Sequence, residues 1–166
     1  MKKLSILCAV LLLSTVAFAA QQSSEWFDMD NCAMCKHLSN RPEMLENMHW
    51  EHHNISNGIV SVTSVKPEYM DEFRRASEGM ESVGKRLQKG EKLPLCPMCT
   101  AYGDLMAKGA KLEYVRTRHG QISIMTSDKP KLVAEIKAWG KRTNEEMKKM
   151  HEAEHGKGEI KKVKIK

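Results

Sequence analysis

The sequence predicts an α+β fold in which two tandem α-β-β-α repeats share a four-stranded antiparallel sheet, with helices on one face. Three observations predict it. The segments that begin at Cys32 and at Cys96 match each other at an offset of about 63 residues. In both segments two β-prone runs are joined by a glycine turn, and an amphipathic helix follows a Lys-Pro pair. One repeat alone would have only a two-stranded sheet, so we expect the two repeats to share one core.

Each repeat opens with a Cys-x-Met-Cys motif that is followed by a short helix. The motifs are Cys32–Cys35 (CAMC) and Cys96–Cys99 (CPMC). Pro97 follows Cys96 directly, and proline is common in the first turn of a helix. Apolar residues continue both segments, namely Leu38, Met44 and Leu45 in the first and Tyr102, Leu105 and Met106 in the second.

A β-hairpin follows the short helix in both repeats. The predicted strands are Met48–Ile55 and Ile59–Thr63 in the first repeat, and Leu112–Arg118 and Gln121–Met125 in the second. The first pair is joined by Ser-Asn-Gly and the second by His-Gly, and Asn-Gly between β-prone runs is a strong signal for a two-residue turn. We expect Gly58 and Gly120 to supply the positive φ that such a turn needs.

A longer amphipathic helix ends each repeat. It follows Lys66-Pro67 in the first repeat and Lys129-Pro130 in the second. The stripes that face the core comprise Tyr69, Met70, Phe73, Ala76, Met80, Val83 and Leu87 in the first helix, and Leu132, Val133, Ile136, Trp139, Thr143, Met147 and Met150 in the second. Because methionine fills irregular gaps in cores, we interpret these methionines as core residues before metal ligands.

Residues 1–19 have the features of a cleaved secretory signal peptide. A basic start, an apolar run over residues 4–13 and small residues at Ala17 and Ala19 support this prediction. The apolar run is too short for a membrane span, so we expect an exported protein, periplasmic or extracellular, without a stable span after cleavage. Cys8 leaves with the signal peptide, so the mature chain keeps four cysteines.

The predicted boundaries beyond the signal peptide follow the repeats. Residues 20–31 form an N-terminal linker, residues 32–90 the first repeat, residues 91–152 the second repeat and residues 153–166 a basic tail. Cleavage lowers the net charge from +6 to about +4, and the basic residues of the tail are interpreted as a solvated terminus. Aromatic residues make up only 5% of the chain and do not interleave with the Lys and Arg residues, so no nucleic-acid partner is expected.

Common catalytic and nucleotide-binding motifs are absent from the sequence. It contains no GxSxG, HExxH, P-loop or strand-linked GxGxxG pattern, and its acidic residues are scattered over polar faces. A binding protein is therefore favoured over an enzyme, and no nucleotide cofactor is expected. Haem is not expected either, because Lys36 stands where the covalent attachment motif needs His.

The two Cys-x-Met-Cys motifs are the residues whose spacing indicates chemistry, and three interpretations remain open. In the first, thiolates bind Cu(I) or Zn(II). The predicted ligand set is Cys32, Cys35, Cys96 and Cys99, with Met34, Met98 and nearby histidines as auxiliary ligands. In the second, Cys96 at a helix N-terminus attacks a disulfide and Cys99 resolves the product. In the third, the cysteines form structural disulfides in a module that only binds a partner protein.

The favoured interpretation is an exported metal-binding protein, a carrier or buffer of a soft metal ion. A thioredoxin-like protein would place its motif after a strand, whereas the helix after Cys96 leads into a hairpin. The histidines of the first hairpin are interpreted as exposed strand residues, with His49 and His53 on one face and His52 on the other. His151 and His155 share a face of the last helix and are also interpreted as exposed.

Overall fold

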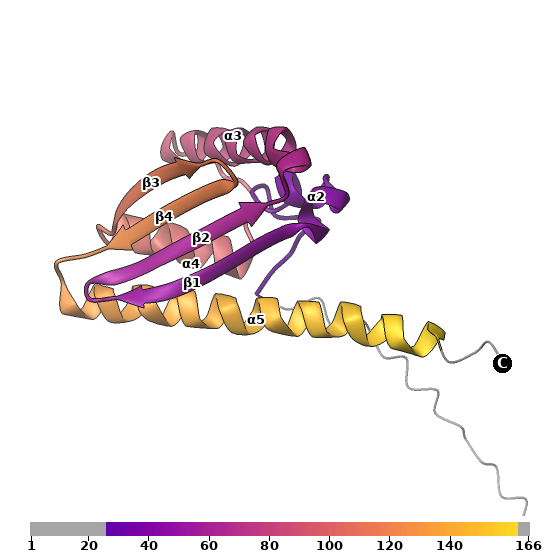
Figure 1. Cartoon of the computed structure of the whole chain (residues 1–166). Coiled ribbons are helices and arrows are strands. Elements are labelled where there is room, and N and C mark those ends of the chain that lie inside the picture. The colour runs from indigo at the N-terminus through magenta and orange to yellow at the C-terminus, as the bar shows by residue number, and fades with distance from the viewer. Residues whose placement is uncertain (1–25, 163–166) are drawn as a thin grey trace, which may run out of the picture.

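The computed structural model describes residues 26–162, with side chains to residue 152, and this part of the chain contains five α-helices and one sheet. The predicted signal peptide, residues 1–19, and the end of the predicted tail lie outside the described residues. In chain order the elements are α1 (Lys36–Ser39), α2 (Pro42–Glu46), β1 (Met48–Ile55), β2 (Gly58–Val65), a 3₁₀ turn (Pro67–Tyr69), α3 (Met70–Gln88), α4 (Pro97–Ala107), β3 (Lys111–Thr117), β4 (Gly120–Thr126) and α5 (Pro130–Lys162) (Figure 1).

The four strands form one antiparallel sheet in the order β1-β2-β4-β3, which confirms the predicted α+β fold. Each predicted hairpin is present, and the two hairpins join through their second strands, with Ile59 opposite Met125 and Ser61 opposite Ser123. Both halves place helical structure before a hairpin and a long helix after it, although the first half has two short helices, α1 and α2, where the second has α4. That the halves arose as repeats of one unit stays a prediction from the sequence.

Helix α5 packs on β1, β2 and β4 and forms the main core with them. This core contains Ile59 and Met125 from the central strands and Leu132, Ile136 and Trp139 from α5. A second, smaller cluster joins α2 and α3 to the end of β2, with Met44, Val65 and Phe73 at its centre. In Figure 1, α4 lies behind the sheet and α5 runs along its β1 side.

The buried residues of the two long helices agree with the predicted stripes. In α3 the buried residues are Met70, Phe73, Ala76 and Val83, and the buried residues of α5 include Leu132, Ile136, Trp139 and Thr143. Helix α5 continues through residues 153–162, for which the sequence predicts a tail. The predicted boundary at residue 152 therefore does not coincide with the end of the helix.

Two glycines allow the central strands to pair, and only one of them has the conformation that the sequence predicted. Gly120 has a φ of 150°, but Gly58 does not have a positive φ, so that prediction was wrong for Gly58. A Cβ atom on Gly58 would overlap the backbone carbonyl of Met125, and one on Gly120 would overlap the carbonyl of Thr63. Each glycine begins a central strand and lies against the backbone of the other central strand.

Replacing Gly58 with alanine is expected to destabilise the fold by about 2–4 kcal/mol, because the overlap is with backbone that cannot move independently of the sheet. Gly103→Ala is the matched control. Gly103 lies inside α4 with nothing near its missing Cβ, so alanine there should stabilise by about 0.5–1 kcal/mol. Urea denaturation followed by circular dichroism measures both, and equal effects of the two substitutions would contradict the proposed close approach.

Candidate metal centre

Both Cys-x-Met-Cys motifs fold as turns that lead into helices. Cys35 immediately precedes α1, and Cys96 is the N-cap residue of α4. The amide of Lys36 donates to the carbonyl of Cys32 at 3.1 Å, and the amide of Thr100 donates to the carbonyl of Cys96 at 2.9 Å. Each motif therefore forms its own helical turn, of the same kind in both. This turn brings the two sulfur atoms of a motif to the same side of the backbone.

Backbone hydrogen bonds hold the two cysteine loops against each other. The amide of Ala33 donates to the carbonyl of Pro94 at 2.8 Å, which joins the first loop to the segment before the second. The amide of Met98 donates to the carbonyl of Trp26 at 3.1 Å, so the second loop also contacts the start of the described chain. These bonds join segments that are 61 and 72 residues apart in sequence.

Helix α5 is joined to the second cysteine loop and to the start of the described chain through two tryptophans. The indole of Trp139 donates to the carbonyl of Met98 at 3.2 Å, inside the second motif. The indole of Trp26 donates to the hydroxyl of Thr143 at 3.2 Å, and the guanidinium of Arg142 lies 3.9 Å from the centre of the Trp26 ring. The helix that forms the main core thus holds the second cysteine loop directly and Trp26, which contacts that loop.

The four predicted cysteines form one cluster. Their Sγ atoms all lie within 4.8 Å of one another, and Cys35 is 3.6 Å from Cys96 and 3.7 Å from Cys99. In a tetrahedral zinc site with Zn–S bonds of about 2.3 Å, neighbouring sulfurs are about 3.8 Å apart. Cys32, Cys35 and Cys96 have exposed fractions of 1–3%. Cys99 is partly exposed. The spacing fits a tetrathiolate site that could bind a metal ion, with Cys99 on its more accessible side.

The cluster distributes its protons unevenly. Hydrogen bonding from Cys35 holds the pKa of Cys32 far below its ordinary value, while the pKa values of Cys35 and Cys99 are raised, first by their hydrogen bonds with Cys32. The bond with Cys32 raises the pKa of Cys96, but the bonds from Cys35 and Cys99 together lower it to about 6. Four thiolates this close would repel one another without a cation, so full ionisation requires a bound metal ion.

All four cysteines are free thiols in this structure, with no disulfide among the described residues. The disulfide interpretation is therefore not the state that the structure describes. The sulfur atoms of the two motifs are nevertheless in contact, so oxidation could form a disulfide between the motifs.

The two methionines of the motifs lie beside the cluster, in hydrophobic packing. Met98 is buried in the main core, and Met34 packs against it with its methyl group toward Gly84 of α3. The structure therefore gives both side chains a packing role. Their predicted role as auxiliary metal ligands stays a prediction.

The histidines do not join the cysteines. Among the described His, Cys, Asp and Glu side chains, the four cysteines are the one group close enough to share an ion. His49 and His53 are exposed on one face of β1, as predicted, and their Nε2 atoms lie 3.7 Å and 3.2 Å from the carboxylate of Glu51. His151 is exposed, and the side chain of His155 lies outside the described residues.

His52 is buried, contrary to the prediction that it is exposed. Strand alternation places it with Trp50 on the helix-facing side of β1, where Trp139 of α5 covers it. Its Nδ1 lies 2.6 Å from the hydroxyl of Ser61, and its Nε2 has no hydrogen-bond partner. Burial lowers the pKa of His52 to about 4. The signal in the sequence is the alternation of residues along the strand. It already placed His52 on the other face of β1 from the exposed His49 and His53, and that other face is the one that the helix covers.

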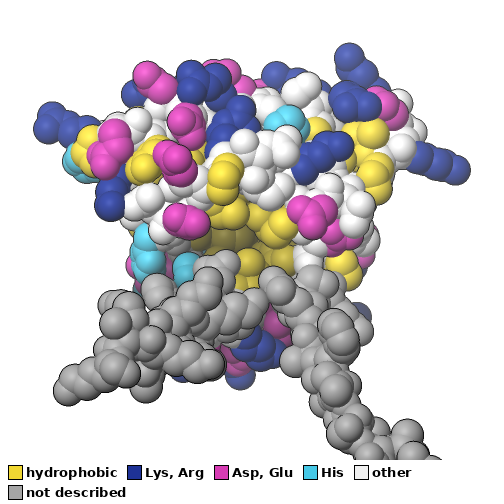
Figure 2. Space-filling view, turned by 90° about the vertical axis from the view of Figure 1, so that its right-hand side faces the viewer, with side chains coloured by type: hydrophobic (Ala, Val, Ile, Leu, Met, Phe, Trp, Pro, Cys, Tyr) yellow, Lys and Arg dark blue, Asp and Glu magenta, His cyan; other side chains and the backbone are white. Residues whose placement is uncertain are grey.

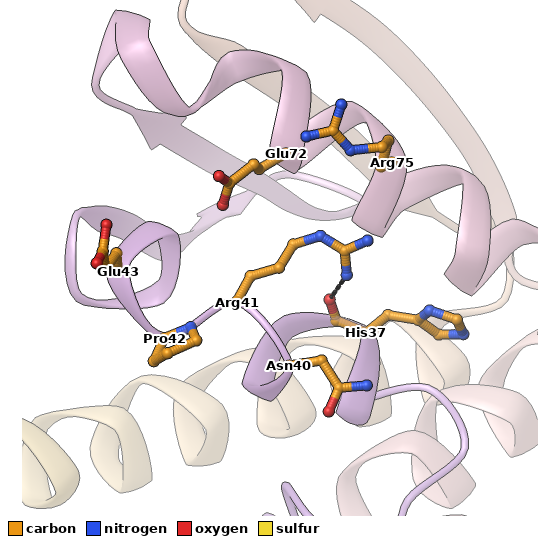
Figure 3. Close-up of a pocket in the computed structure, with 7 residues that line it drawn as sticks. All are labelled: His37, Asn40, Arg41, Pro42, Glu43, Glu72 and Arg75. Carbon is orange, nitrogen blue, oxygen red and sulfur yellow. Dashed lines mark hydrogen bonds between the residues drawn. The ribbon is translucent and has the colours of Figure 1, made fainter.

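Two surface depressions lie near these elements, and neither contains a cysteine. The first, of about 530 Å³ beside α1, α2 and α3, is polar, and Arg41 donates there to the carbonyl of His37 at 2.6 Å (Figure 3). The second, of about 460 Å³, lies between β1 and α5 and includes Trp50 and Met147. Figure 2 shows the end of the molecule that lies at the right of Figure 1, where charged side chains of both signs surround a hydrophobic hollow.

No protein-family model, curated protein or solved structure matches this chain. Among the described residues, no helix combines the length and the apolar composition that a bilayer span requires. The four-cysteine cluster is therefore the feature from which a function can be argued.

Proposed function

We propose that the chain is an exported protein that binds one soft or borderline metal ion, Zn(II) or Cu(I), and serves as a carrier or buffer of that ion. The observation that carries the proposal is the approach of all four cysteine sulfurs to within 4.8 Å of one another. Thiolates prefer Zn(II) and Cu(I) among the common metal ions, whereas hard cations prefer oxygen ligands. The predicted signal peptide supports export.

The spacing of the sulfurs favours Zn(II) over Cu(I). A tetrahedral S₄ arrangement suits Zn(II), and the two shortest printed sulfur distances, 3.6 Å and 3.7 Å, are close to a tetrahedral edge. Much of the main core, including Ile59, Leu132 and Ile136, consists of residues that cannot bind metal. This core supports exchange of the ion without unfolding, as a carrier or buffer needs.

Metal titration of the reduced protein tests the proposal. Zn(II) is added in competition with a chromophoric chelator, and Cu(I) is added without oxygen in a parallel experiment. One ion per chain should bind, and excess chelator should remove it while the helical circular dichroism signal persists. A failure to bind either ion would contradict the metal site, and unfolding on chelation would contradict the carrier or buffer role.

Thiol-disulfide exchange is the second candidate, because Cys96 stands at the N-terminus of α4 and its pKa is lowered to about 6. Its exposed fraction of 2% counts against attack on a substrate disulfide. Alkylation with iodoacetamide near neutral pH separates the candidates. Fast modification of Cys96 in the folded, metal-free protein would support exchange, and protection of Cys96 would support the metal site.

A further inference from the structure

The sheet face that points away from the helices is more apolar than a solvated face needs to be. Val60 and Val62 of β2 lie beside Ile124 and Ile122 of β4, so four β-branched side chains form a contiguous block. The opposite face of the same strands carries Ser61, Thr63, Gln121 and Ser123 between its core residues. The helix-facing side is thus the more polar of the two at these positions.

No described element covers this apolar block. None of its four residues belongs to either hydrophobic core or packs against one. On β3, Val115 stands next to Ile122 with an exposed fraction of 50%, which extends the apolar surface toward the edge of the sheet. In Figure 1, α4 lies behind the sheet and no helix is drawn in front of it. Antiparallel sheets with one solvated face normally alternate apolar and polar residues, and the two central strands of this sheet do not place their polar residues on the uncovered face.

One row across the sheet has a histidine at one end and a carboxylate at the other, and this histidine also lies 3.2 Å from the Glu51 carboxylate on its own strand. That row reads His53 on β1, Val60 on β2, Ile124 on β4 and Glu113 on β3. A two-fold rotation about an axis parallel to the strands exchanges the two edges and keeps each row in place. His53 of one copy then faces Glu113 of the other, and Val60 faces Ile124, each contact occurring twice.

We propose that this face binds the same face of a second copy of the chain, so that two sheets pack as a sandwich around the Val60, Val62, Ile122 and Ile124 block. Aligned sheets pack about 10 Å apart with interdigitating side chains, and branched residues suit that packing. The His53–Glu113 pairs at the rim of the interface set the register of the two sheets. The alternative two-fold axis, perpendicular to the strands, would place β1 of one copy against β1 of the other, and Glu113 would then not face His53. The dimer does not require the bound metal.

Analytical ultracentrifugation of the exported protein tests the proposal. A concentration-dependent dimer is expected, with or without bound zinc. Ile122→Lys should raise the dimer dissociation constant about 30-fold or more, since it places an unpaired charge at the centre of the interface. The double variant Val62→Thr with Ile122→Thr keeps β-branched side chains and should also weaken the dimer. It provides a second test of the surface if the Ile122→Lys variant fails to fold. Tyr114→Lys, at a residue with an exposed fraction of 57% on the other face, is the control and should leave dimerisation unchanged.

A charge exchange in a Glu51→Gln background tests the register, because the Nε2 of His53 also lies 3.2 Å from the Glu51 carboxylate of its own chain. His53→Glu alone and Glu113→His alone should each raise the dissociation constant about 2- to 10-fold, and the double variant should restore it, because the two pairs are re-formed with their partners exchanged. A monomer at all concentrations, or a dimer insensitive to Ile122→Lys, would overturn the proposed surface. Additive weakening in the double variant would overturn the two-fold axis parallel to the strands. Loss of metal binding with a normal dimer would count against the proposed function alone.

Discussion

Replacing Cys35 with serine is expected to weaken zinc binding at least about 100-fold. Cys35 lies within 3.7 Å of two other cysteine sulfurs, so its removal opens one corner of the tetrahedron. Loss of a residue that merely orients a metal ligand already lowers affinity about 10- to 100-fold, and loss of a ligand should cost more. The serine hydroxyl is a poor substitute, because it is neutral at ordinary pH where the thiolate is charged.

Competition with a chelator of known affinity measures this change. Met34→Leu is the matched control, since it alters the neighbouring motif position and keeps the hydrophobic contact with α3. Four thiolates complete a tetrahedral zinc site, so the control should bind zinc as the wild type does. Equal affinity of Cys35→Ser and the wild type would contradict the four-thiolate site. A large loss of Cu(I) affinity in Met34→Leu would instead assign a ligand role to the thioether.

Replacing Trp139 with alanine is expected to destabilise the metal-free protein by about 3–5 kcal/mol. Trp139 of α5 is buried between α4 and the sheet, where its ring lies 4.9 Å from that of His52 and 5.7 Å from that of Tyr102. The substitution also removes the hydrogen bond from its indole to the carbonyl of Met98. It therefore opens a cavity and loosens the second cysteine loop at the same time.

Trp139→Phe separates these two effects. Phenylalanine fills part of the volume but donates no hydrogen bond, so we expect a smaller loss of stability and a clear loss of zinc affinity for this variant. Urea denaturation and chelator competition are measured on both variants. If Trp139→Phe lost stability but bound zinc with unchanged affinity, the indole hydrogen bond would have no part in positioning the loop.

Much of the fold could be predicted because the sequence repeats its signals. The Lys-Pro pairs, the glycine turns and the spaced apolar residues occur in both halves, and each predicted strand and long helix is present. Local spacing could not tell whether the two cysteine motifs meet, because about 60 residues separate them. Their approach depends on the bonds from Ala33 to Pro94 and from Met98 to Trp26, which link segments without any shared sequence signal.

Two residues show where single-residue interpretation fails. Gly58 carries a turn signal, but the structure uses it for a close approach to the carbonyl of Met125, a contact that only the pairing of β2 with β4 creates. His52 has a polar side chain in a polar stretch, yet α5 covers it, because the face of a strand is decided by the helix that packs there. Both depend on tertiary contacts that local patterns do not contain.

X-ray absorption spectroscopy of the zinc-loaded protein tests the four-cysteine site most directly. One zinc ion per chain is expected, surrounded by a single shell of four sulfur atoms at about 2.3 Å. Cys99→Ser should reduce this shell to three sulfurs with one lighter ligand. A wild-type spectrum with nitrogen or oxygen atoms in place of any sulfur, or zinc bound with fewer than four sulfurs, would contradict the assignment of Cys32, Cys35, Cys96 and Cys99 as one site.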